Sequence, residues 1–198
     1  MITENINTRH YFNERASHWH ENTQPDSRKI ALVIAEIGLK PDQNILDVGC
    51  GTGVLFPYLF KLAGNIFAID FARCMAQQAK KNEDRAEVTC GDAEYLPFKS
   101  NLFHHIIAFQ IFPHIQQKNQ ALRECWRTLK NNGEITIFHL NCSRKLNAFH
   151  ATLPEPVNQH TLPGVDQLGD LFLETGFRVQ TKIENPELYL IRGKKVVN

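Results

Sequence analysis

A glycine-rich stretch near residue 50 holds the residues whose types and spacing most directly suggest chemistry. The segment Asn44–Leu55 reads as a short apolar strand, Ile45–Val48, that runs into a turn containing Gly49, Gly51 and Gly53. Because these glycines have no Cβ atom, the turn can adopt positive φ angles, and its amides can face a polar group. The pattern therefore predicts a backbone cradle for a ligand at the end of a buried strand.

Three carboxylates lie at the ends of three successive predicted strands. Asp47 lies two residues before Gly49, in a position suited to a cationic ligand group, and Asp70 follows Gly49 by 21 positions. An acid at about this spacing accepts hydrogen bonds from ribose hydroxyls, although such an aspartate can also be a helix N-cap. Asp92 follows a third strand, 86–90. Because parallel strands end at one edge of a sheet, the three acids favour a polar cofactor with amine and hydroxyl groups.

The dinucleotide-binding fingerprint G-x-G-x-x-G does not fit this turn, because Val54 stands where its last glycine would be. The stretch from Asp47 instead resembles the D-x-G-x-G-x-G motif of the class I S-adenosylmethionine (SAM) dependent methyltransferases, and Gly91–Phe98 resembles their G-D-A-x-x-L-P-F segment. The resemblance covers about residues 40–192 and points more specifically to the type-11, ubiquinone-biosynthesis-like group. It implies an α/β fold: a three-layer Rossmann-like sandwich with a mostly parallel seven-stranded sheet and a C-terminal antiparallel hairpin.

The same resemblance implies which residues bind SAM and its product S-adenosylhomocysteine (SAH). In this family the acid of the glycine motif helps to bind the amino group, the acid after the second strand binds the ribose, and the third acid binds the adenine amino group. These positions are Asp47, Asp70 and Asp92 here. The full expected set is Asp47, Gly49, Cys50, Gly51, Gly53, Asp70, Phe71, Met75, Asp92, Ala93, Gln110 and Tyr11.

The rest of the chain supplies the elements that must position these groups. Amphipathic and alternating patterns predict helices at 27–37, 54–62, 118–129 and 165–175, and strands at 64–70, 103–109, 134–140, 176–183 and 188–191. Lys194 and Lys195 are expected in a frayed, solvated end.

Residues 1–43 are predicted to form an N-terminal helical cap. Tyr11, Phe12, Ala16 and Trp19 recur near helical spacing. In related methyltransferases a leading segment with this aromatic pattern folds over the SAM pocket. Plain packing against the edge of the sheet is the alternative interpretation.

Residues 141–164 are the predicted substrate lid, because loops at the carboxyl ends of strands carry specificity in open α/β folds. The expected acceptor-site residues are His114, Arg144, Asn147, His150 and His160. A general base is needed only if the nucleophile of the acceptor arrives protonated. Histidine titrates near neutral pH, so the candidate bases are His114 and, behind it, His139 and His150.

The amino-acid composition limits the classes of protein to which the chain can belong. Lys plus Arg number 22 against 21 for Asp plus Glu, a formal charge of +1 that favours neither nucleic acid nor an anionic membrane as a partner. Five scattered cysteines without zinc-like spacing suit a reducing cytoplasm, and no apolar stretch approaches the roughly 18 residues of a membrane span. We expect one cytoplasmic domain over residues 1–198, with no bound metal; the sequence leaves the oligomeric state open.

The function predicted from these features is SAM-dependent methyl transfer to a small-molecule acceptor of unknown identity. An RNA or protein methyltransferase is an alternative on the same fold, but the chain has no N-P-P-Y-type motif and no basic appendage. A metal- or metalloid-binding protein and a SAM-binding regulator without transfer activity are further alternatives. The polar lid disfavours the regulator, and the cysteine spacing disfavours a site with several thiolates.

Overall fold

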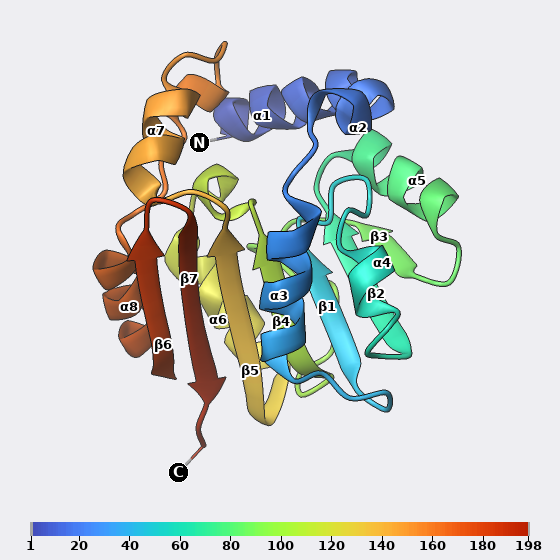
Figure 1. The fold of residues 1–198 in the computed structure, drawn as a ribbon, viewed down its shortest axis with the longest axis vertical. Coiled ribbons are helices and arrows are strands. Elements are labelled where there is room, and N and C mark those ends of the chain that lie inside the picture. Colours follow the sequence, from blue (N-terminus) through green and yellow to red (C-terminus); the bar gives the residue numbers. More distant parts are fainter. Residues whose placement is uncertain (1, 198) are drawn as a thin grey trace.

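The structure of the protein is a computed structural model that describes residues 2–197. Its centre is a seven-stranded sheet with the order β3-β2-β1-β4-β5-β7-β6, in which only the β5–β7 and β6–β7 pairs are antiparallel (Figure 1). The strands are β1 (Asn44–Val48), β2 (Asn65–Asp70), β3 (Glu87–Cys90), β4 (Phe103–Phe109), β5 (Leu129–His139), β6 (Phe177–Asn185) and β7 (Leu188–Lys195). The predicted α/β sandwich with a C-terminal antiparallel hairpin is confirmed.

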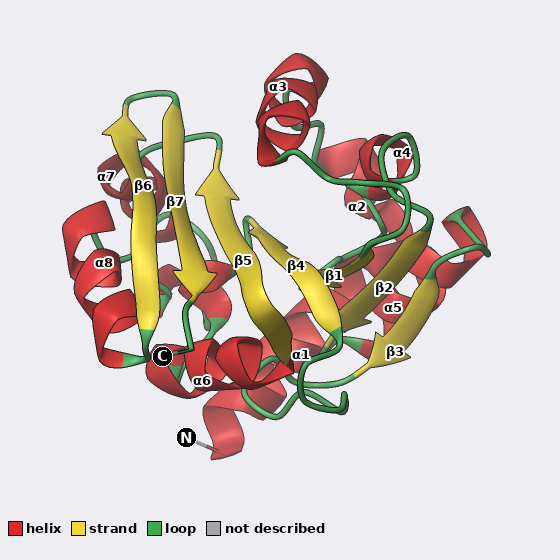
Figure 2. Ribbon diagram, turned by 90° about the horizontal axis from the view of Figure 1, so that it is seen from below, coloured by secondary structure: helices red, strands yellow, loops and turns green. Residues whose placement is uncertain are grey.

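Helices cover both faces of this sheet (Figure 2). They are α1 (Ile2–Arg15), α2 (Trp19–Asn22), α3 (Ser27–Ile37), α4 (Phe56–Leu59), α5 (Arg73–Asn82), α6 (Lys118–Thr128), α7 (Ser143–His150) and α8 (Val165–Glu174). Because side chains alternate along a strand, Ile45 and Ile107 pack toward α3 and α4, whereas Leu46 and Ile106 pack toward α6 and α8. The apolar runs of β1 and β4 are thus buried on both faces, as expected for central parallel strands.

The boundaries of the helix after the glycine turn and of the fifth strand differ from the prediction. The helix expected at 54–62 shortens to Phe56–Leu59, because residues 51–55 continue the glycine turn and Gly53 has a φ of +91°. Strand β5 begins at Leu129 and not at residue 134, since the chain re-enters the sheet as soon as α6 ends. Asn132 lies within it at a φ of +63°, a left-handed conformation that asparagine tolerates.

The N-terminal helix lies across the end of the sheet where the parallel strands finish, beside α7 (Figure 1). Phe12 and Ala16 pack with Met75 at the start of α5 and with Val157 of the segment after α7. A Cβ atom on Gly51 would meet the Trp19 indole nitrogen at 3.9 Å, so this segment also borders the glycine turn. Helix α1 thus covers this end of the sheet, and its role as a cap over a bound ligand stays a prediction.

The C-terminal end of β7 corrects the expectation of a frayed, solvated end. Lys195 is 3% exposed, and its Nζ donates hydrogen bonds to Asn101 Oδ1 (2.9 Å) and to the Leu129 carbonyl oxygen (2.8 Å). The ammonium also lies 4.1 Å from the centre of the Trp126 ring. The last strand is therefore fixed by a buried cation, which hydropathy alone does not predict.

Replacing Lys195 with Met should lower the free energy of unfolding by about 2–3 kcal/mol, because it removes two hydrogen bonds from a charged group and a cation–π contact. Urea denaturation measures the change. Lys194→Met is the matched control at the half-buried neighbour and should stay within about 0.5 kcal/mol of the unmodified protein. Equal losses in the two variants would contradict the anchoring role.

Candidate cofactor and acceptor site

The three acids singled out by the sequence lie at one edge of the sheet. Asp47 is in β1, Asp70 ends the neighbouring β2, and Asp92 follows β3. Asp70 is 6% exposed; its two carboxylate oxygens accept hydrogen bonds from the Gly51 amide (2.8 Å) and from the Ala72 amide (2.9 Å). Burial raises the pKa of Asp70 to about 6, although these two amides act in the opposite direction. Asp70 thus fixes the glycine turn and retains lone pairs for a ligand.

Asp47 is the more unusual acid. It is 1% exposed, and its Oδ2 has no hydrogen-bond partner within the part of the chain that the structure describes. Burial and the charge of Asp70 raise the pKa of Asp47 to about 8. A buried carboxyl oxygen without a donor is costly, so a cationic donor is the group that would complete this site.

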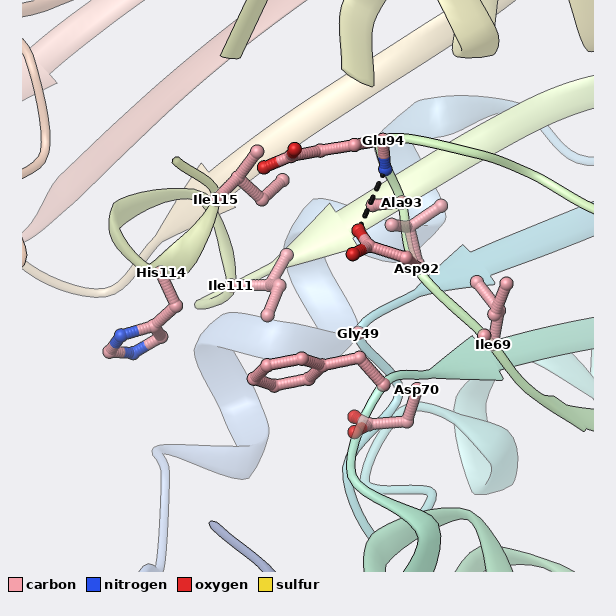
Figure 3. Close-up of a pocket in the computed structure, with 12 residues that line it drawn as sticks. Gly49, Ile69, Asp70, Asp92, Ala93, Glu94, Ile111, His114 and Ile115 are labelled. Atoms are coloured by element: carbon pink, nitrogen blue, oxygen red, sulfur yellow. Dashed lines mark hydrogen bonds between the residues drawn. The ribbon is translucent and has the colours of Figure 1, made fainter. Parts of the chain in front are cut away.

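A cavity with about 400 Å³ of empty space, partly open to solvent, lies beside these acids (Figure 3). Asp70 and Asp92 lie at one side of it, and His114 lies at the opposite margin. The lining residues are Val48, Gly49, Ile69, Asp70, Phe71, Gly91, Asp92, Ala93, Glu94, Ile111, His114 and Ile115. The cavity thus has carboxylates on one side and an imidazole at the opposite margin.

Five residues of the expected cofactor set line this cavity: Gly49, Asp70, Phe71, Asp92 and Ala93. The structure places the others around it. Cys50, Gly51 and Gly53 continue the turn, and Gln110 adopts a φ of +55° directly after β4. Met75 and Tyr11 pack in the cluster under α1 and do not line the cavity, because both side chains pack against Phe12 and its neighbours there.

Glu94 is a lining residue that the sequence did not single out. Its buried carboxylate accepts hydrogen bonds from the backbone amides of Gln116 (3.1 Å) and Gln117 (2.8 Å). It therefore ties the Asp92 loop to the turn before α6. Glu94 occupies a variable position of the G-D-A-x-x-L-P-F pattern. Its position in the cavity depends on the distant amides that it binds, and no local sequence pattern predicts those contacts.

Gly49 is the position where a side chain is least tolerable. Its φ is +69°, and a Cβ atom there would lie 2.3 Å from Cγ1 of Ile111. Ile111 therefore packs directly on the first glycine of the turn, which explains why this position takes glycine for space as well as for conformation.

Replacing Gly49 with Ala should destabilise the protein by about 2–5 kcal/mol, the sum of left-handed strain and overpacking. Gly38→Ala is the control: its φ is +76° with nothing near its Cβ, so it carries only the strain, about 1–2 kcal/mol. Adding Ile111→Ala to Gly49→Ala should recover part of the loss. Thermal unfolding of the unmodified protein, the two single variants and the double variant measures these stabilities. No recovery of stability in the double variant would contradict the packing of Ile111 on Gly49.

Three histidines lie close together on the side of the cavity opposite Asp70 and Asp92. The Nδ1 atoms of His114 and His160 are 2.8 Å apart, and the rings of His114 and His150 stack at 5.2 Å. His150 Nδ1 lies 2.8 Å from the His160 carbonyl oxygen, and His160 Nε2 lies 3.3 Å from the Thr8 hydroxyl of α1. The Phe12 ring contacts His114 edge-on at 5.0 Å, so the cap and the lid meet at this cluster.

His139 completes the group at the end of β5. It is 1% exposed, its ring lies edge-on to Tyr189 at 5.7 Å, and neither ring nitrogen has a hydrogen-bond partner among the described residues. Burial, reinforced by His150, lowers the pKa of His139 to about 3. Burial together with His160, His150 and His139 lowers the pKa of His114 well below its ordinary value. His114 and His139 are therefore uncharged at neutral pH.

Of the five expected acceptor residues, His114 is the one whose side chain lines the cavity. His150 and His160 belong to the histidine cluster behind it, and the other two lie elsewhere in the lid. Arg144 is exposed on α7, because its position on the helix turns it toward solvent. Asn147 uses both ends of its amide on Leu162, whose carbonyl accepts at 3.0 Å and whose amide donates at 2.8 Å. Asn147 thus connects two parts of the lid, and Arg144 lies on the solvent-exposed side of the lid.

Within the described residues, no group of three or more His, Cys, Asp or Glu side chains is arranged to hold a metal ion. None of the helices described is both long enough and apolar enough to cross a membrane.

Comparison with known proteins places this site in context. Residues 46–137, which include β1, the glycine turn and β4, match the family described as "Methyltransferase domain". The demethylmenaquinone methyltransferase of Renibacterium salmoninarum is 28% identical over 106 residues, which are 54% of this chain and 45% of that protein. The mitochondrial arginine-hydroxylase NDUFAF5 of Danio rerio is 27% identical over 175 residues, which are 79% of this chain and 54% of that protein. This chain spans about half the length of these curated relatives.

Solved structures agree with the fold. A SAM-dependent methyltransferase from Aquifex aeolicus superimposes with a TM-score of 0.74 at 21% identity, covering 91% of this chain and 98% of that one. The superposition covers more of this chain than residues 46–137, so the shared fold extends beyond the segment matched to the family.

Proposed function

Because the chain belongs to the class I SAM-dependent methyltransferases, we propose that it binds SAM at the carboxyl edge of the sheet and transfers its methyl group to a small molecule. The observation that carries the proposal is Asp47, a buried carboxyl whose Oδ2 has no donor among the residues described, next to a glycine turn fixed by Asp70. Such a site is matched by a ligand that carries both an ammonium and a hydroxylated sugar.

The acids have distinct roles in this proposal. Asp47 binds the ammonium of the amino-acid part, Asp70 binds the ribose hydroxyls, and Asp92 binds the adenine amino group. Phe71 and Ala93 supply apolar surface for the adenosine, since both line the cavity. SAM, when bound, supplies an electrophilic methyl group on a positively charged sulfur. The protein contributes position and the exclusion of water.

The acceptor is proposed to lie between the cavity and the histidines, under α1 and the lid. His114 is the member of the cluster that lines the cavity, and it is the first candidate to contact the acceptor. If the nucleophile arrives protonated, the uncharged His114 ring accepts the proton, with His139 and His150 behind it. The demethylmenaquinone methyltransferase among the relatives supports a small molecule as the class of acceptor.

The test is transfer of label from methyl-labelled SAM to an extract of small metabolites, with the extracted RNA and protein fractions in parallel. Label in the metabolite fraction that disappears with Asp70→Ala supports the proposal. Label confined to RNA or protein would favour a macromolecular acceptor. Binding of SAM without any transfer would favour a regulator, or a different reaction such as the hydroxylation named for one relative.

A further inference from the structure

The His139 ring is buried without a hydrogen-bond partner among the described residues, and methyl transfer by itself does not explain this. A second buried histidine, His105 in β4, offers a comparison: it is 5% exposed, and its Nε2 is bonded to the Thr136 hydroxyl at 2.9 Å. Burial lowers the pKa of both rings to about 3. Only His139 lacks a partner at both nitrogens among the described residues, and it lies at the edge of the sheet where ligands bind. Leaving a buried donor and acceptor unpaired is costly, so His139 indicates a polar ligand.

The charges around the cluster indicate the class of that ligand. The pKa of His114 is lowered by burial, by His160, His150 and His139, and by Lys118 of α6. Lys118 Nζ donates a hydrogen bond to the carbonyl oxygen of Ile115, which lines the cavity beside His114. Among the described residues, no carboxylate is hydrogen-bonded to His114, His139 or His150. Of the acids that line the cavity, Asp70 and Asp92 lie on the side opposite His114, and the Glu94 carboxylate is engaged by the Gln116 and Gln117 amides. An anion beside the histidines would therefore meet ring N–H donors and the positive charge of Lys118.

We propose that His139, with His114, binds the oxyanion of a small acidic acceptor, a carboxylate or a phenolate. The inference rests on the proposed function and names the substrate class of the same site. A neutral imidazole has one N–H group, and that of His150 is donated to the His160 carbonyl oxygen. In this arrangement His160 donates to His114 between their Nδ1 atoms, so His114 and His139 can each donate one hydrogen bond to the oxyanion without first taking up a proton.

The chemistry of such an acceptor balances without a base. A lone pair of the oxyanion forms the new O–CH₃ bond, and the S–CH₃ bond breaks with its electron pair remaining on sulfur. The products are a neutral methyl ester or methyl ether and neutral sulfur in SAH, and no proton is released. The histidines then orient and desolvate the nucleophile, and His114 need not act as a general base.

The experiment compares acetate and benzoate with methylammonium and benzylammonium, which match them in size and oppose them in charge. Each is titrated into the SAH-saturated protein, and again without SAH, while NMR follows the ring nitrogens of His139. We expect the anions to bind at least tenfold more tightly than the ammonium ions and to shift the His139 signals. Ammonium ions that bind as tightly, or anions that leave His139 unshifted, would overturn the proposal.

Two variants separate ligand binding from folding. His139→Phe removes both unpaired nitrogens, so we expect an unchanged or higher melting temperature and at least tenfold weaker anion binding. His105→Phe, the matched control, leaves Thr136 without its partner, so it should lower the melting temperature and preserve anion binding. Unchanged anion binding in His139→Phe would overturn the inference. Failure of SAH to raise the melting temperature would instead contradict the proposed function, and the titrations without SAH would still test His139.

Discussion

Replacing Asp47 with Asn is expected to weaken SAM binding roughly 100-fold while it stabilises the free protein at alkaline pH. The loss of affinity follows from removing a charged partner for the ammonium, worth about 1.5–3 kcal/mol, where about 1.4 kcal/mol is a factor of ten. The stabilisation follows because asparagine is uncharged in a site where Asp47 is 1% exposed and Oδ2 has no partner among the residues described. Opposite effects on folding and on binding distinguish a ligand-binding acid from a structural one.

The dependence of these effects on pH has a definite sign. Burial and Asp70 raise the folded-state pKa of Asp47 from 3.8 to about 8, so the folded protein binds more protons than the unfolded chain between about pH 4 and 8. The free energy of unfolding contributed by this group therefore falls as the pH rises through that window. The Asp47→Asn variant lacks this titrating group, so its gain in stability over the unmodified protein should grow from pH 5 to pH 9.

Cofactor binding should show the linked effect in the unmodified protein. Binding of an ammonium favours ionised Asp47, so affinity for SAM should rise between pH 6 and pH 7.5, with a proton released on binding. Calorimetric titrations in buffers of different ionisation enthalpy measure the number of protons released on binding. If the Asp47→Asn variant binds SAM with the same affinity and the same proton release as the unmodified protein, the role assigned to Asp47 is contradicted.

Replacing Asp70 with Ala is expected to reduce SAM affinity by at least 100-fold. The change removes the acceptor for the Gly51 amide (2.8 Å) and the Ala72 amide (2.9 Å), and it removes the partner proposed for the ribose. Two hydrogen bonds from the ribose hydroxyls to the charged Asp70 carboxylate would be worth about 3 kcal/mol, enough for this factor. The shift in melting temperature produced by saturating SAH measures it.

The matched control is Asp166→Ala. Asp166 is exposed on α8 and pairs with Lys182, far along the sheet from the cavity. Its replacement should leave the shift produced by SAH unchanged, since exposed ion pairs contribute little. Equal losses for Asp70→Ala and Asp166→Ala would show that the effect reports general destabilisation and not the site.

The sequence predicted most of what local patterns determine. The apolar runs of β1 and β4, the glycine turn and the acids at the ends of β1, β2 and β3 are short-range features, and the parallel arrangement brings the acids to one edge. The contacts among His114, His150 and His160 come from the structure, because the sequence placed the lid at this edge but not its side chains relative to one another. These predictions needed only periodicity and the direction of the strands.

The features that the sequence did not predict depend on contacts between distant segments. Lys195 is buried because Asn101 and the Leu129 carbonyl accept its hydrogen bonds, and Glu94 lines the cavity because the amides before α6 hold it there. Asn147 looked like an acceptor ligand but is engaged by Leu162 across the lid. The spacing of residues along the chain does not predict such hydrogen-bond partners. The positions of charged and amide side chains were therefore the hardest to predict from the sequence.

The most direct measurement is a calorimetric titration of the protein with SAM, SAH and NAD at pH 7.5. We expect SAM and SAH each to bind at one site per chain, NAD not to compete with them, and both affinities to fall at least 100-fold in Asp70→Ala. Binding of NAD or another nucleotide at this edge of the sheet, without binding of SAM or SAH, would contradict the proposed SAM site.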